Sequence, residues 1–153
     1  MGFQRKKSRG ICLAAAAFLA LTLSGCGRAG ERTQGAIQMI GELDYQGALE
    51  QLDAAEADGE DGRLVNRARG IAYMGLTDYE QAAFWFEEAL GESGGVVQNV
   101  DYDLNFYLAA AYTKNGRYSD AEDIYDAVLA LRPGEEDAYF LRGNVRLQLG
   151  NHK

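Results

Sequence analysis

The stretch Gly75–Leu90 reads GLTDYEQAAFWFEEAL and combines a turn with an amphipathic helix. Its first four residues include a glycine and an aspartate, which favour turns. The following apolar side chains recur at steps of three and four residues: Tyr79, Ala82, Phe86 and Ala89. This spacing places them on one stripe of a helix with about 3.6 residues per turn. The stretch therefore predicts a turn followed by a helix that buries one face.

The same pattern occurs once upstream and once downstream of this stretch. Upstream, GELDYQGA starts at Gly41, and its glycine and tyrosine each precede their counterparts by 34 residues. Downstream, GRYSDA starts at Gly116, and its tyrosine follows Tyr79 by 39 residues, which indicates an insertion of five residues. The apolar stripes of these two units are Tyr45, Ala48, Leu52 and Ala55, and Tyr118, Ala121, Tyr125 and Val128. The chain therefore repeats one helical unit three times.

Turn-forming residues divide the remaining sequence into further helices. The stretches 58–62 and 91–95 are rich in glycine and acidic residues and mark breaks. Pro133, the single proline of the 153 residues, stands where a helix ending near Leu131 must stop. One proline and an apolar content of 47% favour an all-α fold with a packed core. We expect seven helices, at about residues 35–43, 45–57, 64–74, 79–90, 101–114, 118–131 and 135–149.

The first 30 residues differ in composition from the rest of the chain. Four basic residues fall within the first ten positions, and the apolar run Ile11–Leu23 follows them. Thirteen residues are too few to span a bilayer comfortably, but they are typical of the core of an export signal. The sequence therefore predicts secretion across a membrane.

The end of this signal resembles the lipobox of bacterial lipoproteins. Leu23, Ser24 and Gly25 precede Cys26, with the leucine and the second small residue at the places that this pattern requires. The resemblance implies that Cys26 receives a diacylglyceryl group on sulfur and becomes the first residue of the mature chain. Two or three acyl chains hold a protein stably at a bilayer, since each buried methylene contributes about 0.8 kcal/mol. An ordinary signal peptide cut at nearby small residues is the alternative.

These features divide the chain into three expected parts. Residues 1–25 are the signal peptide, 26–34 the lipidated N-terminus with a short polar tether, and 35–153 the helical repeat domain. We expect the lipid at Cys26 to hold the mature protein on the extracytoplasmic side of the cell membrane. In an organism with two membranes the outer membrane is also open, because Gly27 stands where an aspartate would favour inner-membrane retention.

Charge and the residue inventory exclude several classes of function. Without the four N-terminal basic residues, 11 basic and 23 acidic residues remain, and a net charge near −12 repels nucleic acid. Cys12 lies in the removed segment, Cys26 is consumed by lipid, and His152 is the single histidine. We therefore expect no disulfide, no metal site, no cofactor and no cysteine- or histidine-based nucleophile.

Acidic clusters are the remaining candidates for catalysis. Glu87 and Glu88, and the group Asp120, Glu122 and Asp123, could be imagined as general acid–base pairs. Adjacent residues of a helix point in different directions, however, and such clusters are typical of a solvated outer face. We expect a protein that is not an enzyme.

The 34-residue unit of helix, turn and helix resembles the tetratricopeptide repeat from about Gly30 to the C-terminus. The matching residues are Gly70, Tyr73, Tyr79, Ala82, Phe86 and Ala89 in the second unit, and Ala109, Tyr112, Gly116, Tyr118, Ala121, Tyr125, Val128 and Pro133 in the third. The first unit is weaker, with Ala36 and Met39 in its opening helix. The resemblance implies an all-α, right-handed superhelical solenoid of antiparallel helix pairs, with about three repeats and a C-terminal capping helix. An irregular helical bundle is the alternative.

The last expected helix, at residues 135–149, has two interpretations. Arg142 and Arg146 stand where the family has apolar or aromatic residues, which favours a solvent-facing cap. Gly150 and Asn151 stand where another turn between two helices would begin, which favours a sequence truncated within a fourth repeat. We expect the cap.

In this family the first helices of successive repeats line a concave groove. Transferred position by position, the resemblance implies a largely apolar groove with two cations, which suits an extended or helical peptide. The alternative for each of these side chains is a place in the core between repeats. The candidate groove residues are Ile37, Ile40, Arg67, Ile71, Met74, Phe106, Thr113, Lys114, Phe140, Asn144 and Leu147.

Together these inferences predict an interaction protein. We expect a membrane-anchored, non-catalytic scaffold or adaptor that holds a protein or a peptide segment at the cell envelope. An accessory docking subunit of a cell-envelope enzyme or secretion complex is the alternative. Self-association into a homo-oligomer through uncapped repeat ends is a third interpretation.

Overall fold

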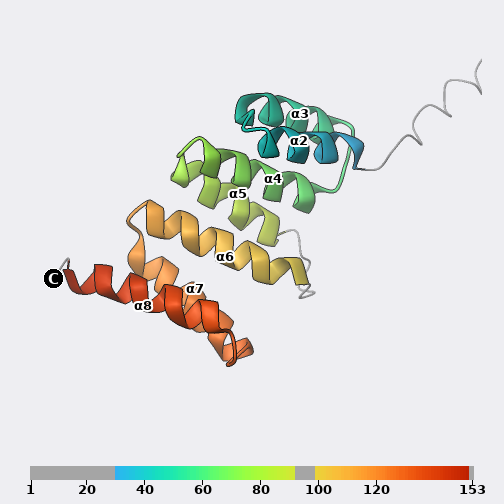
Figure 1. Ribbon diagram of the computed structural model, residues 1–153. Coiled ribbons are helices and arrows are strands. Elements are labelled where there is room, and N and C mark those ends of the chain that lie inside the picture. The colour runs from blue at the N-terminus through green and yellow to red at the C-terminus, as the bar shows by residue number, and fades with distance from the viewer. Residues whose placement is uncertain (1–29, 92–98, 152–153) are drawn as a thin grey trace, which may run out of the picture.

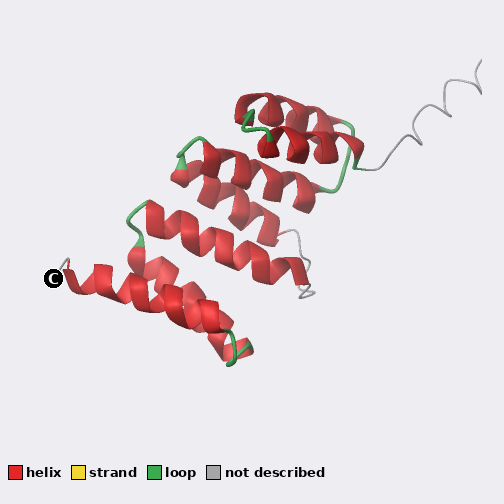
Figure 2. Ribbon diagram, in the orientation of Figure 1, coloured by secondary structure: helices red, strands yellow, loops and turns green. Residues whose placement is uncertain are grey.

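A computed structural model describes residues 30–91 and 99–151 (Figure 1). The predicted signal peptide, Leu23, Ser24, Gly25, Cys26 and His152 lie outside the described residues. In the described part of the chain every regular element is an α-helix (Figure 2). The helices are α2 (Glu31–Gly41), α3 (Tyr45–Ala57), α4 (Gly62–Gly75), α5 (Tyr79–Gly91), α6 (Asn99–Lys114), α7 (Tyr118–Leu131) and α8 (Glu136–Asn151).

The helices stack in chain order as antiparallel pairs. The pairs are α2 with α3, α4 with α5 and α6 with α7, and α8 packs against α7. Neighbouring pairs meet through α3 and α4 and through α5 and α6. The first helices of neighbouring pairs also touch, because α2 contacts α4 and α4 contacts α6. Figure 1 shows this stack running from α2 to α8, so the predicted all-α solenoid of helix pairs is confirmed.

The turn inside each pair ends its first helix with one hydrogen-bond pattern, the Schellman motif. The bonds are Asp44 N–H to Met39 O at 2.9 Å, Asp78 N–H to Tyr73 O at 3.0 Å and Arg117 N–H to Tyr112 O at 2.8 Å. The left-handed residue of each motif is Leu43, Thr77 or Gly116, with φ of 66°, 61° and 77°. Gly116 therefore corresponds to Leu43 and Thr77. Gly41 and Gly75, with which the quoted sequence motif begins in the first two units, lie two residues earlier, at the ends of α2 and α4.

Aspartates at the ends of the first two of these turns start the second helices. Asp44 Oδ1 accepts a hydrogen bond from Gly47 N–H over 3.0 Å, and Asp78 Oδ1 accepts one from Gln81 N–H over 3.2 Å. Such bonds satisfy amide groups that a helix leaves unpaired at its first turn. Arg117 holds the corresponding place before α7, has no side-chain cap, and forms an ion pair with Asp120.

Close approach between α4 and its neighbours depends on two glycines. A Cβ at Gly70 would lie 2.4 Å from the ring of Phe86, and a Cβ at Gly75 would lie 2.2 Å from the ring of Tyr45. Glycine therefore lets these two rings rest against the backbone of α4. The stripe that defined the repeat is confirmed as a packing surface: Tyr79 is half-buried, and Ala82, Phe86 and Ala89 are buried.

The core consists of two clusters that meet at α4. The N-terminal cluster contains Ala36, Ala48, Leu52, Ala55, Val65 and Ala68. The C-terminal cluster is built from α5 to α8, and Ile71, Tyr73 and Met74 of α4 pack against it. Helix α4 therefore contributes to both clusters and connects them.

Two arginines of α4 reinforce this connection. Arg63 forms a buried ion pair with Asp101 of α6. Arg69 is buried, with Nη2 lying 2.8 Å from Asp53 Oδ1 and 2.7 Å from Glu56 Oε2, both on α3. Its guanidinium also lies over the Trp85 ring of α5, 4.5 Å from the ring centroid. A single side chain of α4 thus contacts both neighbouring helices.

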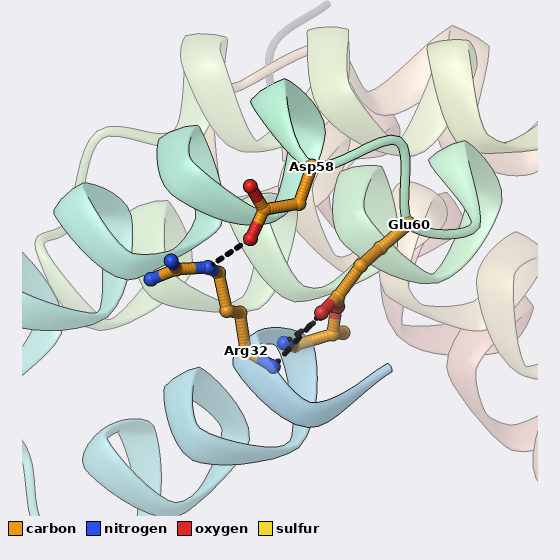
Figure 3. Close-up of polar contacts among 4 residues, drawn as sticks. Arg32, Asp58 and Glu60 are labelled. Atoms are coloured by element: carbon orange, nitrogen blue, oxygen red, sulfur yellow. Dashed lines mark hydrogen bonds and ion pairs between the residues drawn. The ribbon is translucent and has the colours of Figure 1, made fainter. Parts of the chain in front are cut away.

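Helix α2 begins at Glu31, four residues before the expected start, so residues 31–34 of the predicted tether are helical. Glu60 explains the earlier start (Figure 3). Its two carboxylate oxygens accept hydrogen bonds from Arg32 N–H and Thr33 N–H, each over 2.9 Å. Thr33 Oγ1 donates a further bond over 2.6 Å. A carboxylate at a helix N-terminus satisfies unpaired amides and complements the helix dipole.

The contact between Glu60 and the start of α2 is charged and is supported by a neighbouring ion pair. Hydrogen bonds from the Thr33 side chain and from the two backbone amides hold the pKa of Glu60 below its usual value. The Arg32 side chain also reaches the adjoining loop and forms an ion pair with Asp58 (Figure 3). Gly30, the residue before α2, supplies no side-chain cap. The start of α2 is therefore fixed by the loop between α3 and α4.

Helix α8 is fixed on α7 by ion pairs. Arg142 pairs with Asp126, and Arg146 Nε lies 2.5 Å from Glu122 Oε1. The two arginines that were expected to face solvent therefore contact acids of the preceding helix. Ala138 and Val145 are buried beneath them in the C-terminal cluster.

Candidate functional site

The predicted groove residues lie on the first helices of the pairs and on α8. Those on α2, α4 and α6 share a surface, because these helices contact one another in turn. The others lie on α8, which packs against α7. We call the whole set the first-helix face: Ile37 and Ile40 on α2, Arg67, Ile71 and Met74 on α4, Phe106, Thr113 and Lys114 on α6, and Phe140, Asn144 and Leu147 on α8.

Six members of the first-helix face are half-buried. They are Ile40, Arg67, Ile71, Met74, Phe106 and Thr113. Ile40 packs against the N-terminal cluster, whereas Ile71, Met74 and Phe106 pack against the C-terminal cluster. The Phe106 ring lies 6.1 Å from the ring of Tyr125, centroid to centroid. These side chains therefore take part in packing between helices and present only part of their surface to solvent.

Two of the polar members are engaged within the fold. The guanidinium of Arg67 lies over the Tyr107 ring, 5.4 Å from its centroid, which is the geometry of a cation–π contact. Arg67 Nε is buried and has no hydrogen-bond partner among the described residues. Thr113 Oγ1 donates to Ala109 O over 2.7 Å within α6. Lys114, at the end of α6, is exposed.

The other apolar members of the face are exposed. Ile37 is 41% exposed on α2, and Phe140 and Leu147 are 69% and 66% exposed on α8. Asn144 is exposed between the last two. Large apolar side chains with this exposure are available for contact with a partner, whereas scattered single ones are ordinary surface.

The sequence pattern missed one position on each of three helices. Leu64, three residues before Arg67 and seven before Ile71, shares their face of α4 and is 45% exposed. Asp103 and Asp137 stand three residues before Phe106 and Phe140, and both are exposed. These two carboxylates equal Arg67 and Lys114 in number, so the charges of these four side chains sum to zero. The helical spacing from the residues already chosen could have identified all three.

The acidic clusters considered for catalysis make structural contacts. Glu87 accepts a hydrogen bond from Tyr112 Oη. Burial, aided by this bond, raises the pKa of Tyr112 to about 12, so the phenol stays protonated at neutral pH. Asp120 pairs with Arg117 over 2.6 Å, and Glu122 pairs with Arg146. Glu88 and Asp123, the other two members, are exposed.

Three further features of the described residues bear on function. No group of three or more His, Cys, Asp or Glu residues there is arranged to hold a metal ion. No helix there has the length and apolar content needed to span a bilayer. A hollow of about 470 Å³ lies at the start of α7, lined by Gly116, Arg117, Tyr118, Ser119, Asp120 and Leu149. None of the predicted groove residues lines this hollow.

Comparison with known protein families shows which family has this arrangement of helix pairs. Two sequence models of the tetratricopeptide repeat match the chain, one over residues 73–145 and one over residues 41–96. Together with the stacked helix pairs, these matches show that the chain belongs to the tetratricopeptide-repeat family. Helix α2, most of which precedes both matches, extends the same pairing at the N-terminal end.

A solved structure shows the same fold. The second tetratricopeptide domain of human RPAP3, determined by NMR in complex with the HSP70 peptide SGPTIEEVD, superposes with a TM-score of 0.64. The match has 22% sequence identity and covers 77% of this chain and 94% of that domain. A search of curated proteins found no match to the chain.

Proposed function

We propose that the protein is a non-catalytic scaffold that binds an apolar peptide segment of a partner protein on its first-helix face. The observation that carries the proposal is the exposure of large apolar side chains on this face: Ile37 and Leu64 on the adjoining α2 and α4, and Phe140 and Leu147 on α8. Aliphatic anchors on rigid helices suit an amphipathic helix or an extended segment with matching apolar residues.

The charges of the face favour a partner that binds mainly through apolar contacts. Arg67 and Lys114 are balanced by Asp103 and Asp137, and Arg67 is already stacked on Tyr107. The RPAP3 domain is in complex with a peptide whose last four residues are two glutamates, a valine and an aspartate. One half-buried arginine and one lysine provide too few positive charges to hold such an acidic end. We therefore propose an apolar peptide as the ligand class.

We further propose that the chain acts at a membrane. The support is in the sequence: the basic head, the apolar run Ile11–Leu23 and the lipobox ending at Cys26. A lipid at Cys26 would lie only a few residues before the start of α2 at Glu31. The repeat domain would then present its partner close to the extracytoplasmic surface of the cell envelope.

Site-specific photo-crosslinking tests the binding proposal. A photoreactive residue at Leu64, and in a second variant at Ile37, should capture the same protein in intact cells. Phe84 is the matched control because it is 48% exposed on α5, a second helix. Capture of that protein from Phe84 alone, or from none of the three positions, would refute the first-helix face as the binding site. The identity of the captured protein distinguishes a scaffold from a docking subunit of an envelope enzyme.

Phe106 is unsuitable for this test because its ring packs against Tyr125. A substitution there would disturb the C-terminal cluster along with any bound peptide. Leu64→Ser with Ile37→Ser should instead weaken capture while leaving the helical circular dichroism unchanged. Phe84→Ser serves again as the control and should leave capture intact.

Membrane attachment has its own test. Cys26→Ser should move the protein from the membrane fraction to the soluble fraction, because no thiol remains at the lipobox position to accept a diacylglyceryl group. Metabolic labelling with a fatty acid should mark the wild-type chain and leave the variant unlabelled. Continued sedimentation of Cys26→Ser with membranes would contradict the lipid anchor.

A further inference from the structure

The turn between α6 and α7 contains the dipeptide Asn115–Gly116. Of the six asparagines in the chain, Asn115 is the one that glycine follows. Both residues are exposed, and within residues 30–91 and 99–151 the Asn115 side chain has no hydrogen-bond partner. The side-chain carboxamide of an exposed asparagine can react with the backbone amide nitrogen of a glycine that follows it.

The reaction is cyclisation followed by hydrolysis. The amide nitrogen of Gly116 loses its proton to hydroxide and attacks Cγ of Asn115, so that a carbon–nitrogen bond forms and ammonia leaves. Water then opens the resulting five-membered imide at either carbonyl carbon. One opening gives aspartate, and the other gives isoaspartate, in which the chain continues through the side-chain carbon. The net change is consumption of one water and release of one ammonia, with no oxidant or reductant.

The local geometry leaves the attacking nitrogen accessible. Gly116 has no Cβ to hinder the approach of Cγ, and nothing lies within 4 Å of the place where a Cβ would stand. Its N–H donates to Thr113 O over 3.3 Å, whereas the N–H groups of Leu43, Thr77 and Gly59 in the equivalent motifs donate over 3.1, 3.1 and 2.9 Å. Gly116 also borders the hollow at the start of α7, which admits water to the turn.

The chain offers an internal comparison at Asp58–Gly59. Gly59 has a φ of 73° and ends α3 with the same hydrogen-bond pattern. The side chain before it is a carboxylate held in an ion pair with Arg32, and a carboxylate is a far poorer acyl group for imide formation than a carboxamide. The same backbone turn therefore carries a reactive side chain at Asn115 and a much less reactive one at Asp58.

We propose that Asn115 is a site of spontaneous deamidation in the folded protein, with isoaspartate and aspartate as its products. Each conversion places a carboxylate at the C-terminal end of α6, beside Lys114. Negative charge is unfavourable there because the helix dipole already places partial negative charge at that end. Isoaspartate also adds one atom to the main chain inside the loop that the bond from Arg117 N–H to Tyr112 O closes over 2.8 Å. The modification therefore loosens the α6–α7 turn and alters the charge at the edge of the first-helix face.

Peptide mapping by mass spectrometry tests the proposal on the full-length protein. Folded wild-type protein, held for several days at mildly alkaline pH, should gain one mass unit in the peptide 70–117 released by cleavage at arginine. Fragmentation should place the gain at Asn115 and not at Asn105. In water enriched in oxygen-18 the same peptide should carry one oxygen from solvent.

Two parallel samples decide the result. Asn115→Gln, which forms the larger imide ring slowly, should show no gain, and wild-type protein in urea shows the reactivity of the unfolded sequence. A gain in the urea sample alone would show that the fold protects Asn115, and the proposal would be wrong. An equal gain in Asn115→Gln, or none in any sample, would refute it as well. Circular dichroism confirms that the variant is folded.

Discussion

At the scale of single residues, the three left-handed turn positions carry different types of residue. Gly116 adopts a positive φ at no steric cost, whereas Leu43 and Thr77 hold φ of 66° and 61° with a Cβ. A side chain in this region costs about 1–2 kcal/mol, and a β-branched one is a stronger outlier. The turns of the first two repeats therefore store strain that the turn of the third does not.

Leu43→Gly and Thr77→Gly should each stabilise the protein. Relief of the steric cost exceeds the added flexibility of glycine in the unfolded chain, leaving a gain of about 0.5–1 kcal/mol. Urea unfolding followed by circular dichroism measures the change. Gly116→Ala is the reciprocal control and should destabilise by about 1 kcal/mol. Loss of stability in both glycine variants would show that the turn conformation is not strained.

Glu60 makes the stability of α2 depend on pH. Its pKa is lowered in the folded state by hydrogen bonds from Thr33 and from two backbone amides. The stabilisation is therefore complete above the ordinary value of 4.5 and is lost as the pH falls through the lower, folded-state pKa. Glu60→Gln should be less stable than wild type at neutral pH, and the two proteins should converge in acid.

Unfolding curves measured across this acid range check the prediction. Glu50→Gln removes an exposed carboxylate of α3 and is the matched control. It should stay close to wild type at every pH. A constant difference between wild type and Glu60→Gln from neutral to acidic pH would show that the Glu60 carboxylate charge is not involved.

At the scale of helices, the repeat made most of the fold predictable. The recurrence of a tyrosine and a small residue three places later located α3, α5 and α7 within a residue or two of their observed ends. The start of α2 could not be predicted in this way, because Glu60 lies 27 residues beyond Thr33 in the chain. The left-handed residues do not follow from the pattern either, since glycine fills that position in only one of the three turns.

Two helical glycines should respond to alanine with opposite signs. Gly70→Ala would drive a methyl group into the Phe86 ring, and overpacking of this kind costs about 1–3 kcal/mol. Gly143→Ala, in α8, meets no atom within 4 Å and should stabilise by up to about 1 kcal/mol through helix propensity. Thermal or urea unfolding of the two variants measures both effects. An equal response in both would mean that the contact between Phe86 and Gly70 does not govern the packing of α5 on α4.

At the scale of the whole molecule, the junction between the two core clusters is partly electrostatic. Arg63→Met should destabilise the protein by about 3–5 kcal/mol, because it removes the cation that faces the buried Asp101 carboxylate. Arg32→Met breaks the exposed pair with Asp58 and should change stability little. Denaturant unfolding of both variants provides the comparison. Equal, small losses would show that the buried pair contributes no more than the surface pair.

The candidate site was less predictable than the fold. The position of each residue within the family's repeat pattern placed the chosen residues on the first helices and α8. It did not distinguish exposed from half-buried members. That difference depends on neighbours: Tyr125 beside Phe106 and Tyr107 beside Arg67 come from other helices. Leu64 was missed because it lies in the first turn of α4, before the residues of that helix that carry the repeat pattern.

The contact between Glu60 and the start of α2 also has a mechanical consequence. A chain that is pulled from its N-terminal end transmits the force first to the first turn of α2. There the force meets Glu60 and Asp58, which belong to the loop leading into α4 (Figure 3). The load would therefore pass directly to the second helix pair. This contact would resist separation of the first pair from the stack if the proposed membrane anchor and the proposed partner pulled in opposite directions.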